Sequence, residues 1–208
     1  MKKPGCEIAL GHKPLLIIIS GPSGAGKDAV LALMKESDIT FERIITVTTR
    51  PQRAMERDKV DYYFVTTAKF QDMREHGELL EWAQVYGNWY GVPKEAVKGA
   101  LQKGRDVIIK VDVQGAATIK KIVPQSILIY LVTPSAGELE NRLKQRSTES
   151  SADLALRTKI AAEELKQLAL FDYVVINKPG EIAQAVSDIL AIITAEKCRV
   201  THREVASL

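Results

Sequence analysis

The 208-residue sequence predicts an α/β fold in which a parallel sheet is covered by helices on both faces. Apolar, β-branched runs recur along the chain, as expected of strands that are buried on both faces. Helical patterns separate these runs, and strands that alternate with helices indicate a parallel sheet. The first run leads directly into a glycine-rich turn and a helix-like stretch. With 46% hydrophobic and 26% charged residues, the composition supports a single domain with a substantial core.

Each element follows from the local pattern. The predicted core strands are residues 15–20 (LLIIIS), 107–111 (VIIKV), 127–132 (ILIYLV) and 173–176 (YVVI). The predicted helices are residues 29–37, 94–103, 116–123, 136–146 and about 152–170. We expect right-handed connections between the parallel strands.

Residues 41–90 break this alternation. They hold short alternating strands, such as 60–65 (VDYYFV) and 78–86 (ELLEWAQVY), around one helix, and they are dense in aromatic residues and arginines. We interpret this segment as an insert with mixed or antiparallel strands. It is expected to lie over the carboxyl ends of the core strands, where open α/β sheets bind ligands.

Residues 21–27 (GPSGAGK) match the phosphate-loop pattern G-x-x-x-x-G-K. Glycines let the backbone N–H groups turn inward, and the following helix adds its positive N-terminal end. The motif lies between a predicted strand and a predicted helix, which favours a P-loop kinase fold that binds ATP. Lys27 is expected to bridge the β- and γ-phosphates. The predicted ATP-binding residues of the loop are Gly21, Pro22, Ser23, Gly24, Ala25, Gly26, Lys27 and Asp28.

Asp28 departs from the motif, which has Ser or Thr after the lysine as a ligand of Mg²⁺. A carboxylate is also a suitable ligand, so Asp28 is a candidate to hold the Mg²⁺ that accompanies ATP. An acidic residue in the first turn of a helix also stabilises the helix dipole. The sequence favours both explanations equally.

A series of further motifs resembles the guanylate kinase family. After the phosphate loop they run in the order 48–53 (TTRPQR), 61–62 (DY), 81–83 (EWA), 87–91 (GNWYG), 111–115 (VDVQG), Arg142, Arg146, Arg157 and 175–177 (VIN). The similarity covers nearly the whole chain and is far more specific than the loop alone. It implies an ATP-dependent nucleoside monophosphate kinase that phosphorylates GMP, and dGMP, and releases ADP.

The chemistry of the insert suits the phosphate of GMP, which is a dianion that needs several fixed donors. Arg50 and Arg53 offer planar forks, and Tyr62 and Tyr90 offer hydroxyl groups. The resemblance implies that these four residues hold the GMP phosphate. Taken alone, the two arginines would more often be a solvated surface pair.

Guanine carries N–H donors at N1 and N2, which a carboxylate can accept together, whereas adenine has no such pair. Glu81 is predicted to read the base in this way, with Asp112 assisting at the amino group. The resemblance adds a contact from the Thr46 hydroxyl. Because an unpaired buried carboxylate is costly, such a site should reject AMP strongly. Val92 replaces the hydroxyl residue usual in the family, which removes a hydrogen bond worth about 1 kcal/mol.

The resemblance also assigns residues that close over the phosphates. Arg142, Arg146 and Arg157 flank the polar stretch 147–152 and are expected to form a mobile lid that acts with Lys27 and Arg50 in catalysis. Asn177 is assigned to the adenine of ATP. A charged helix face is the ordinary alternative for the arginines. The expected division is one domain, 1–208, with a core of about 14–40, 92–134 and 168–197, an insert of about 41–91 and a lid of about 135–167.

Lys110 is a second departure, because the family usually has an acidic residue two places before Asp112. Position 28 has become anionic where position 110 has become cationic. In a phosphate-loop fold the two positions are neighbours, so we expect Asp28 and Lys110 to pair within about 4 Å. The alternative is a lysine that points to solvent.

The sequence also leaves alternative functions to consider and gives expectations for partners and location. The segments 26–28 (GKD) and 90–92 (YGV) also occur in ribose 1,5-bisphosphate phosphokinases, and some related domains are non-catalytic binding modules. A net charge of +3 without clustered basic residues argues against a nucleic-acid partner. Two cysteines and the lack of a long apolar run predict a cytoplasmic protein with no membrane span. The oligomeric state is left open.

Overall fold

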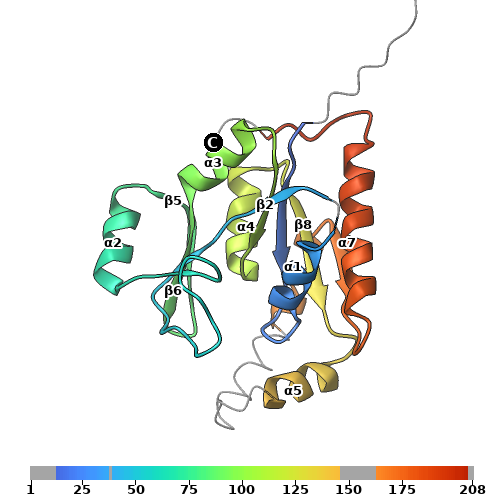
Figure 1. The fold of residues 1–208 in the computed structure, drawn as a ribbon, viewed down its shortest axis with the longest axis horizontal. Coiled ribbons are helices and arrows are strands. Elements are labelled where there is room, and N and C mark those ends of the chain that lie inside the picture. The colour runs from blue at the N-terminus through green and yellow to red at the C-terminus, as the bar shows by residue number, and fades with distance from the viewer. Residues whose placement is uncertain (1–12, 38, 146–162, 206–208) are drawn as a thin grey trace, which may run out of the picture.

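Two sheets of different construction form the molecule, and Figure 1 shows them side by side. This computed structural model describes residues 13–37, 39–145 and 163–205. The larger sheet is parallel throughout and has the order β2 (Phe41–Arg43), β7 (Asp106–Lys110), β1 (Leu16–Ser20), β8 (Ile127–Val132) and β9 (Tyr173–Ile176). The predicted α/β class is confirmed.

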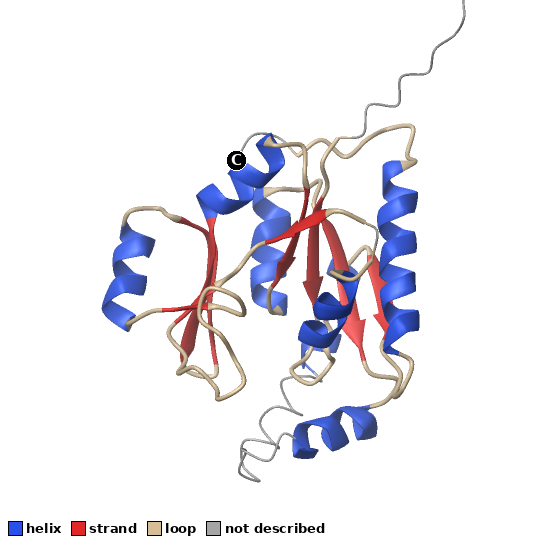
Figure 2. Ribbon diagram, in the orientation of Figure 1, coloured by secondary structure: helices blue, strands red, loops and turns tan. Residues whose placement is uncertain are grey.

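Helices cover both faces of this larger sheet (Figure 2). Helices α1 (Lys27–Met34) and α7 (Ile182–Lys197) pack on one face, and α3 (Lys94–Gln102) and α4 (Val113–Ile122) pack on the other. Strand β1 lies in the middle and is buried along its whole length. Its run of apolar residues is explained by this position, since both faces meet helices.

The smaller sheet belongs to the insert and has the order β4 (Tyr63–Phe64), β3 (Val47–Thr48), β6 (Asn88–Pro93) and β5 (Leu79–Val85). Strands β3 and β4 are parallel and the other pairs are antiparallel, so the sheet is mixed, as expected. Helix α2 (Thr67–Glu75) covers it with Phe70, whose ring stacks on Trp89 at 5.9 Å. The insert therefore has a small core of its own.

The structure differs from the predicted elements in three places. Residues 41–43, which the sequence placed in the insert, form β2 at the edge of the larger sheet beside β7. An edge strand of three half-buried residues has no apolar run to reveal it. Helix α7 was not predicted, although its buried residues Ala185, Val186, Ile189 and Ile193 have helical spacing. Most of the predicted helix 152–170 lies outside the described residues, and its end is the short 3-10 helix η1 (Leu168–Leu170).

Two remaining features complete the described fold. Helix α5 (Ala136–Gln145) projects from the end of β8 and begins the segment that the sequence predicts as the lid. Within the described ranges, no helix combines the length and the apolar character needed to cross a membrane.

Candidate functional site: a cleft between two sheets

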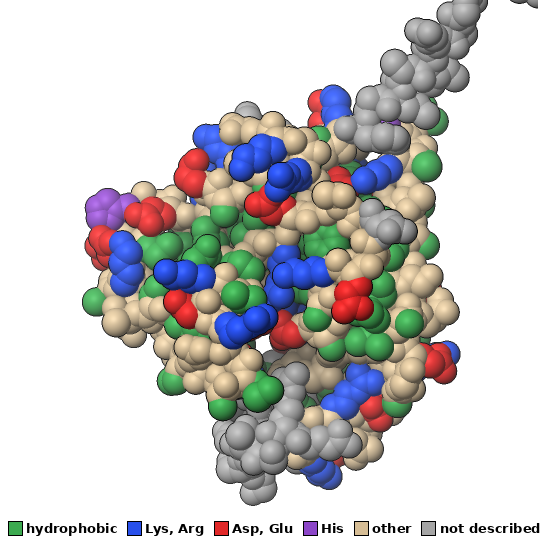
Figure 3. Space-filling model, in the orientation of Figure 1, with side chains coloured by type: hydrophobic (Ala, Val, Ile, Leu, Met, Phe, Trp, Pro, Cys, Tyr) green, Lys and Arg blue, Asp and Glu red, His purple; other side chains and the backbone are tan. Residues whose placement is uncertain are grey.

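A cleft of about 410 Å³ opens where the carboxyl ends of β1 and β7 face the insert. Figure 3 shows Lys and Arg side chains gathered around the hollow between the two parts. Most of the residues predicted from the sequence line this cleft. They are Gly21, Ser23, Gly24, Gly26, Lys27, Asp28, Thr46, Arg50, Arg53, Tyr62, Glu81, Tyr90 and Asp112.

The phosphate loop depends on glycine where its backbone turns. Gly26 has φ 93°, and a Cβ atom there would lie 2.4 Å from the Asn177 side-chain nitrogen. That same Asn177 nitrogen donates to the Ala25 carbonyl at 2.8 Å. Asn177 is 4% exposed. The amide that the sequence assigned to adenine therefore supports the loop from outside the cleft in this structure.

Lys27 lies over the loop that precedes it. Its Nζ donates to the carbonyl oxygens of Gly21 at 2.5 Å and Pro22 at 3.0 Å. Both bonds hold the ammonium at the mouth of the ring of loop amides. The loop therefore presents a fixed cation beside the main-chain donors, which is the arrangement that binds the phosphates of a nucleoside triphosphate.

The arginines of the insert are gathered by Glu56, which the sequence analysis did not single out. Arg50 Nη2 donates to Glu56 Oε1 at 2.7 Å, and Arg53 Nη1 lies 3.9 Å from the same oxygen. Burial works against the Glu56 charge, but the hydrogen bonds from Arg50 and from the Arg53 backbone outweigh it, so the pKa of Glu56 lies below its usual value. One carboxylate thus gathers the two guanidinium groups before any phosphate arrives.

Two tyrosines complete this anion-binding end of the cleft. The rings of Tyr62 and Tyr90 meet edge to face at 6.1 Å. The Arg50 guanidinium lies 5.4 Å from the centre of the Tyr62 ring. The structure thus brings together three of the four residues predicted to hold the GMP phosphate, and Arg53 lines the same cleft with a half-exposed side chain.

Glu81, on strand β5 of the insert, also lines the cleft and is buried, with 2% exposure. Among the described residues, its Oε2 has no hydrogen-bond partner. Burial, followed by repulsion from Asp112, raises the pKa of Glu81 to about 8. A buried carboxyl without a partner is costly, and a ligand that supplies two donors would remove that cost.

Asp112 and Thr46 lie in the same part of the cleft. Asp112 caps helix α4, because its side chain accepts from the Gly115 N–H at 3.0 Å. Burial raises the pKa of Asp112, and these backbone hydrogen bonds oppose the rise. Thr46 also lines the cleft and is buried, with 5% exposure.

Gly115 makes room for the Glu81 carboxylate. A Cβ atom at Gly115 would lie 2.9 Å from Glu81 Oε2 and 3.0 Å from Oε1. Gly115 ends the motif 111–115 that resembles the guanylate kinase family, but the motif does not reveal this role, because the role depends on how α4 packs against β5. The first turn of α4 therefore forms the floor under the carboxylate.

We expect Gly115→Ala to weaken GMP binding by about tenfold, because the added methyl group displaces the carboxylate that it would otherwise touch. Stability should not fall, since alanine is favoured over glycine in a helix by about 1 kcal/mol. Titration calorimetry with GMP and thermal unfolding measure the two effects separately. Gly99→Ala is the matched control, because Gly99 lies in helix α3 and, apart from the backbone of its own helix and its chain neighbours, no described atom lies within 4 Å of the methyl group that alanine would add there. Equal GMP affinities for the two variants would contradict the floor role of Gly115.

The predicted pair of Asp28 and Lys110 is confirmed. Lys110 Nζ donates to Asp28 Oδ1 at 2.5 Å, and Arg43 Nη2 lies 3.6 Å from the same oxygen. Burial works against the Asp28 charge, but the attraction of Lys110 outweighs it and keeps the pKa of Asp28 below its usual value. Both cations contact Oδ1, and the role of Asp28 as a ligand of Mg²⁺ stays a prediction.

Three further assignments have different outcomes. Arg142 lies beside the loop, with its Nη2 donating to the Asn177 carbonyl at 2.9 Å and its Nε to Glu138 at 2.6 Å. Arg146 and Arg157 lie outside the described residues. Val92 is fully buried in the core cluster between the larger sheet and the insert.

Glu164 lines the cleft and was also missed by the sequence analysis. Burial raises the pKa of Glu164 to about 7, although the charge of Lys27 opposes the rise. Its Oε2 is buried and has no hydrogen-bond partner within the part of the chain that the structure describes. The residue lies near the end of the expected lid of about 135–167, and no local motif marks it as part of a phosphate site.

Comparisons with known proteins agree with this geometry. The family model of guanylate kinase matches residues 13–196. A guanylate kinase from Caldanaerobacter subterraneus is 45% identical, with 95% of each chain covered. Guanylate kinase 2, chloroplastic/mitochondrial, from Oryza sativa is 44% identical and covers 97% of this chain and 75% of its own length. The crystal structure of guanylate kinase from Anaplasma phagocytophilum superposes with a TM-score of 0.77 at 28% identity, covering 91% of this chain and 89% of its own.

Proposed function

The chain belongs to the guanylate kinase family, and from this we infer that it transfers the γ-phosphate of ATP to GMP, or dGMP, to give GDP, or dGDP, and ADP. One observation supports GMP as the acceptor of the phosphate. The buried Glu81 carboxyl, whose Oε2 has no hydrogen-bond partner among the described residues, shares a single cleft with the arginine–tyrosine cluster of the insert. A guanine at Glu81 and a phosphate at Arg50 satisfy both groups with one molecule.

We assign the donor to the phosphate loop. Its amides and Lys27 hold the β- and γ-phosphates of ATP, and Lys27 stabilises the charge that develops on the transferred group. Arg142 lies next to the loop and joins this cluster from α5. We assign the same closing role to Arg146 and Arg157, and adenine contact to Asn177, on the family resemblance alone.

We assign the acceptor to the insert. Arg50, Arg53, Tyr62 and Tyr90 hold the GMP phosphate, and Thr46, Glu81 and Asp112 surround its base. Arg50 exchanges Glu56 for the incoming phosphate, which the planar guanidinium can bind through two parallel hydrogen bonds. Because the two nucleotides enter from opposite sides of one cleft, their phosphates meet near Lys27.

Mg²⁺ accompanies ATP in this proposal. It supplies charge neutralisation on the phosphates when it is bound. Among the described residues, no group of three or more metal-ligating side chains gathers in one place, and Asp28 is paired with Lys110. The phosphate oxygens of ATP and water are therefore the proposed ligands, and the candidate role of Asp28 as a ligand stays a prediction.

A coupled assay that offers GMP, dGMP, AMP and ribose 1,5-bisphosphate separately tests the proposal. We expect turnover with GMP and dGMP, and a specificity constant for AMP lower by about 10⁴-fold, because adenine lacks the pair of N–H donors that the Glu81 carboxylate accepts from guanine. Turnover of ribose 1,5-bisphosphate in preference to GMP would support the alternative kinase, which the comparisons do not favour. A lack of all four activities would support a binding module. A cytoplasmic location, without a nucleic-acid or membrane partner, stays a prediction.

A further inference from the structure

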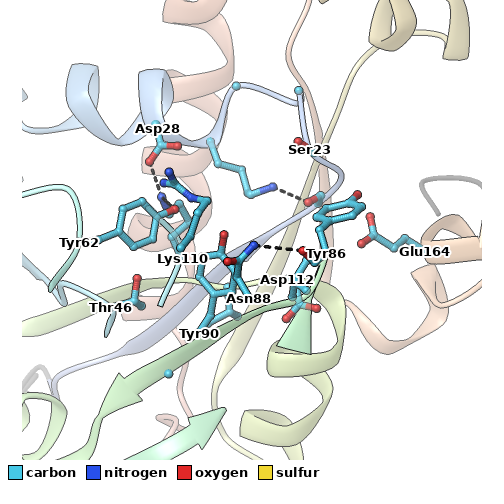
Figure 4. A pocket seen from close by; sticks show the side chains of 18 of the residues that line it. Ser23, Asp28, Thr46, Tyr62, Tyr86, Asn88, Tyr90, Lys110, Asp112 and Glu164 are labelled. Carbon is cyan, nitrogen blue, oxygen red and sulfur yellow. Dashed lines mark hydrogen bonds and ion pairs between the residues drawn. The ribbon is translucent and has the colours of Figure 1, made fainter. Parts of the chain in front are cut away.

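Lys110 is a buried lysine in the cleft to which the reaction described above gives no role. It is the last residue of β7, and its side chain is 7% exposed. Its ammonium donates to Asp28 Oδ1 at 2.5 Å and to Tyr62 Oη at 2.6 Å (Figure 4). One ammonium therefore joins the core sheet, the helix after the phosphate loop, and the insert.

The direction of the bond to Tyr62 follows from the chemistry of the two groups. An ammonium has three donors and no acceptor, so Tyr62 Oη must be the acceptor. The hydroxyl proton of Tyr62 is not used in this bond. It remains for donation to a further acceptor, and a cation at the oxygen makes the phenol a stronger donor. Arg50, which is expected to bind a phosphate, lines the same cleft, and its guanidinium lies over the Tyr62 ring.

The Tyr62 ring is held as well as its hydroxyl. The Lys110 ammonium lies 4.3 Å from the ring centre, and the Tyr90 ring packs against Tyr62. Burial works against the Lys110 charge, but the attraction of Tyr62 and Asp28 outweighs it, and the pKa of Lys110 is raised. The ammonium is thus charged at neutral pH, and the ring has one orientation before a substrate arrives. A donor that is oriented in advance loses less conformational freedom on binding.

We propose that Lys110 is a positioning residue for the acceptor phosphate: it fixes the Tyr62 hydroxyl as a hydrogen-bond donor toward that phosphate, with Asp28 as its counter-charge. The inference rests on the proposed function, because it requires a phosphorylated acceptor at the insert. It assigns to Lys110 an effect on acceptor binding that is transmitted through Tyr62. The donor nucleotide, which the phosphate loop holds, should be affected little.

A double-mutant cycle on full-length protein tests this. Lys110→Met removes the ammonium but keeps most of the stem, and Tyr62→Phe removes only the hydroxyl. We expect Lys110→Met to raise the Kd for GMP and the KM for GMP about tenfold, the worth of a charge-assisted hydrogen bond, and to change the KM for ATP less than about twofold. In the Tyr62→Phe background, adding Lys110→Met should raise the Kd for GMP by less than about twofold, because the hydroxyl is already gone.

Controls separate this role from a loss of charge or of fold. Lys103→Met removes an exposed lysine after helix α3 and should leave GMP binding unchanged. Lys110→Arg keeps the charge and the donors and should recover most of the GMP affinity. If Lys110→Met does not fold, Lys110→Gln takes its place in the cycle; because its neutral amide can still donate to Tyr62, we expect a smaller rise in the Kd for GMP, again without a change for ATP and again lost in the Tyr62→Phe background.

Three results overturn the inference. The first is a Lys110→Met variant that binds GMP with wild-type affinity. The second is a double variant whose loss of GMP affinity equals the product of the losses of Lys110→Met and Tyr62→Phe. The third is a Lys110→Met variant that loses affinity for ATP and for GMP equally. Each would leave the proposed function intact as long as the wild-type protein binds GMP. A wild-type protein that binds no GMP would overturn both.

Discussion

Lys27→Met is expected to lower the rate of phosphoryl transfer by about 10³-fold or more while the protein stays folded. The Lys27 side chain donates to the carbonyl oxygens of Gly21 and Pro22, so its ammonium lies at the phosphate loop itself. Without it, the charge that develops on the transferred phosphoryl group loses its nearest fixed cation. Single-turnover kinetics with ATP and GMP measure the chemical step directly.

Lys35→Met is the matched control, because Lys35 follows the same helix α1 but is exposed and remote from the cleft. It should retain wild-type turnover. Thermal unfolding of both variants should show the same cooperative transition. Near-full activity in Lys27→Met would mean that the loop does not hold the transferred phosphate, and the catalytic assignment would then be wrong.

Glu81→Gln is expected to raise the Kd for GMP by about 10²-fold or more and to leave the Kd for an ATP analogue within about twofold. The glutamine amide presents an N–H group where guanine also presents donors, so one hydrogen bond is lost and two donors face each other. Glu78→Gln, an exposed change three residues earlier, is the control and should bind GMP normally. Equal losses of GMP and ATP affinity in Glu81→Gln would contradict base reading by this residue.

The pH dependence of GMP binding supplies a second test of Glu81. Burial and the repulsion of Asp112 raise its pKa to about 8, so the free protein holds a proton there at pH 7. Guanine needs the carboxylate, and GMP binding must therefore release that proton. The affinity should rise roughly tenfold between about pH 6.8 and pH 8.5, and the rise should be absent in Glu81→Gln. An affinity independent of pH in this range would mean that the carboxyl does not accept from the base.

The sequence could predict the parts of the fold and site that are local in the chain. The core strands and the phosphate loop are contiguous, and each carries its own pattern of apolar residues or glycines. The pairing of Asp28 with Lys110 was also predictable, because parallel topology places the end of β7 beside the helix that leaves the loop. These predictions needed only strand order and residue chemistry.

The remaining features depend on packing between distant segments. The Glu81 carboxylate has room because Gly115 on α4 packs against β5. The sequence around either residue does not predict this contact. Glu56 is only six residues from Arg50, but its sequence position alone looks like a solvated loop, and only the folded turn brings the two side chains to 2.7 Å. Strand β2 was missed because only its pairing to β7 identifies it, whereas the periodicity of helix α7 would have revealed that helix.

A crystal structure with GMP and a non-hydrolysable ATP analogue tests the central claim most directly. We expect the GMP phosphate among Arg50, Tyr62 and Tyr90, the guanine N1 and N2 groups donating to Glu81, and the γ-phosphate of the analogue at Lys27, facing the acceptor oxygen. GMP bound outside the cleft, or with its phosphate turned away from Lys27, would contradict the account.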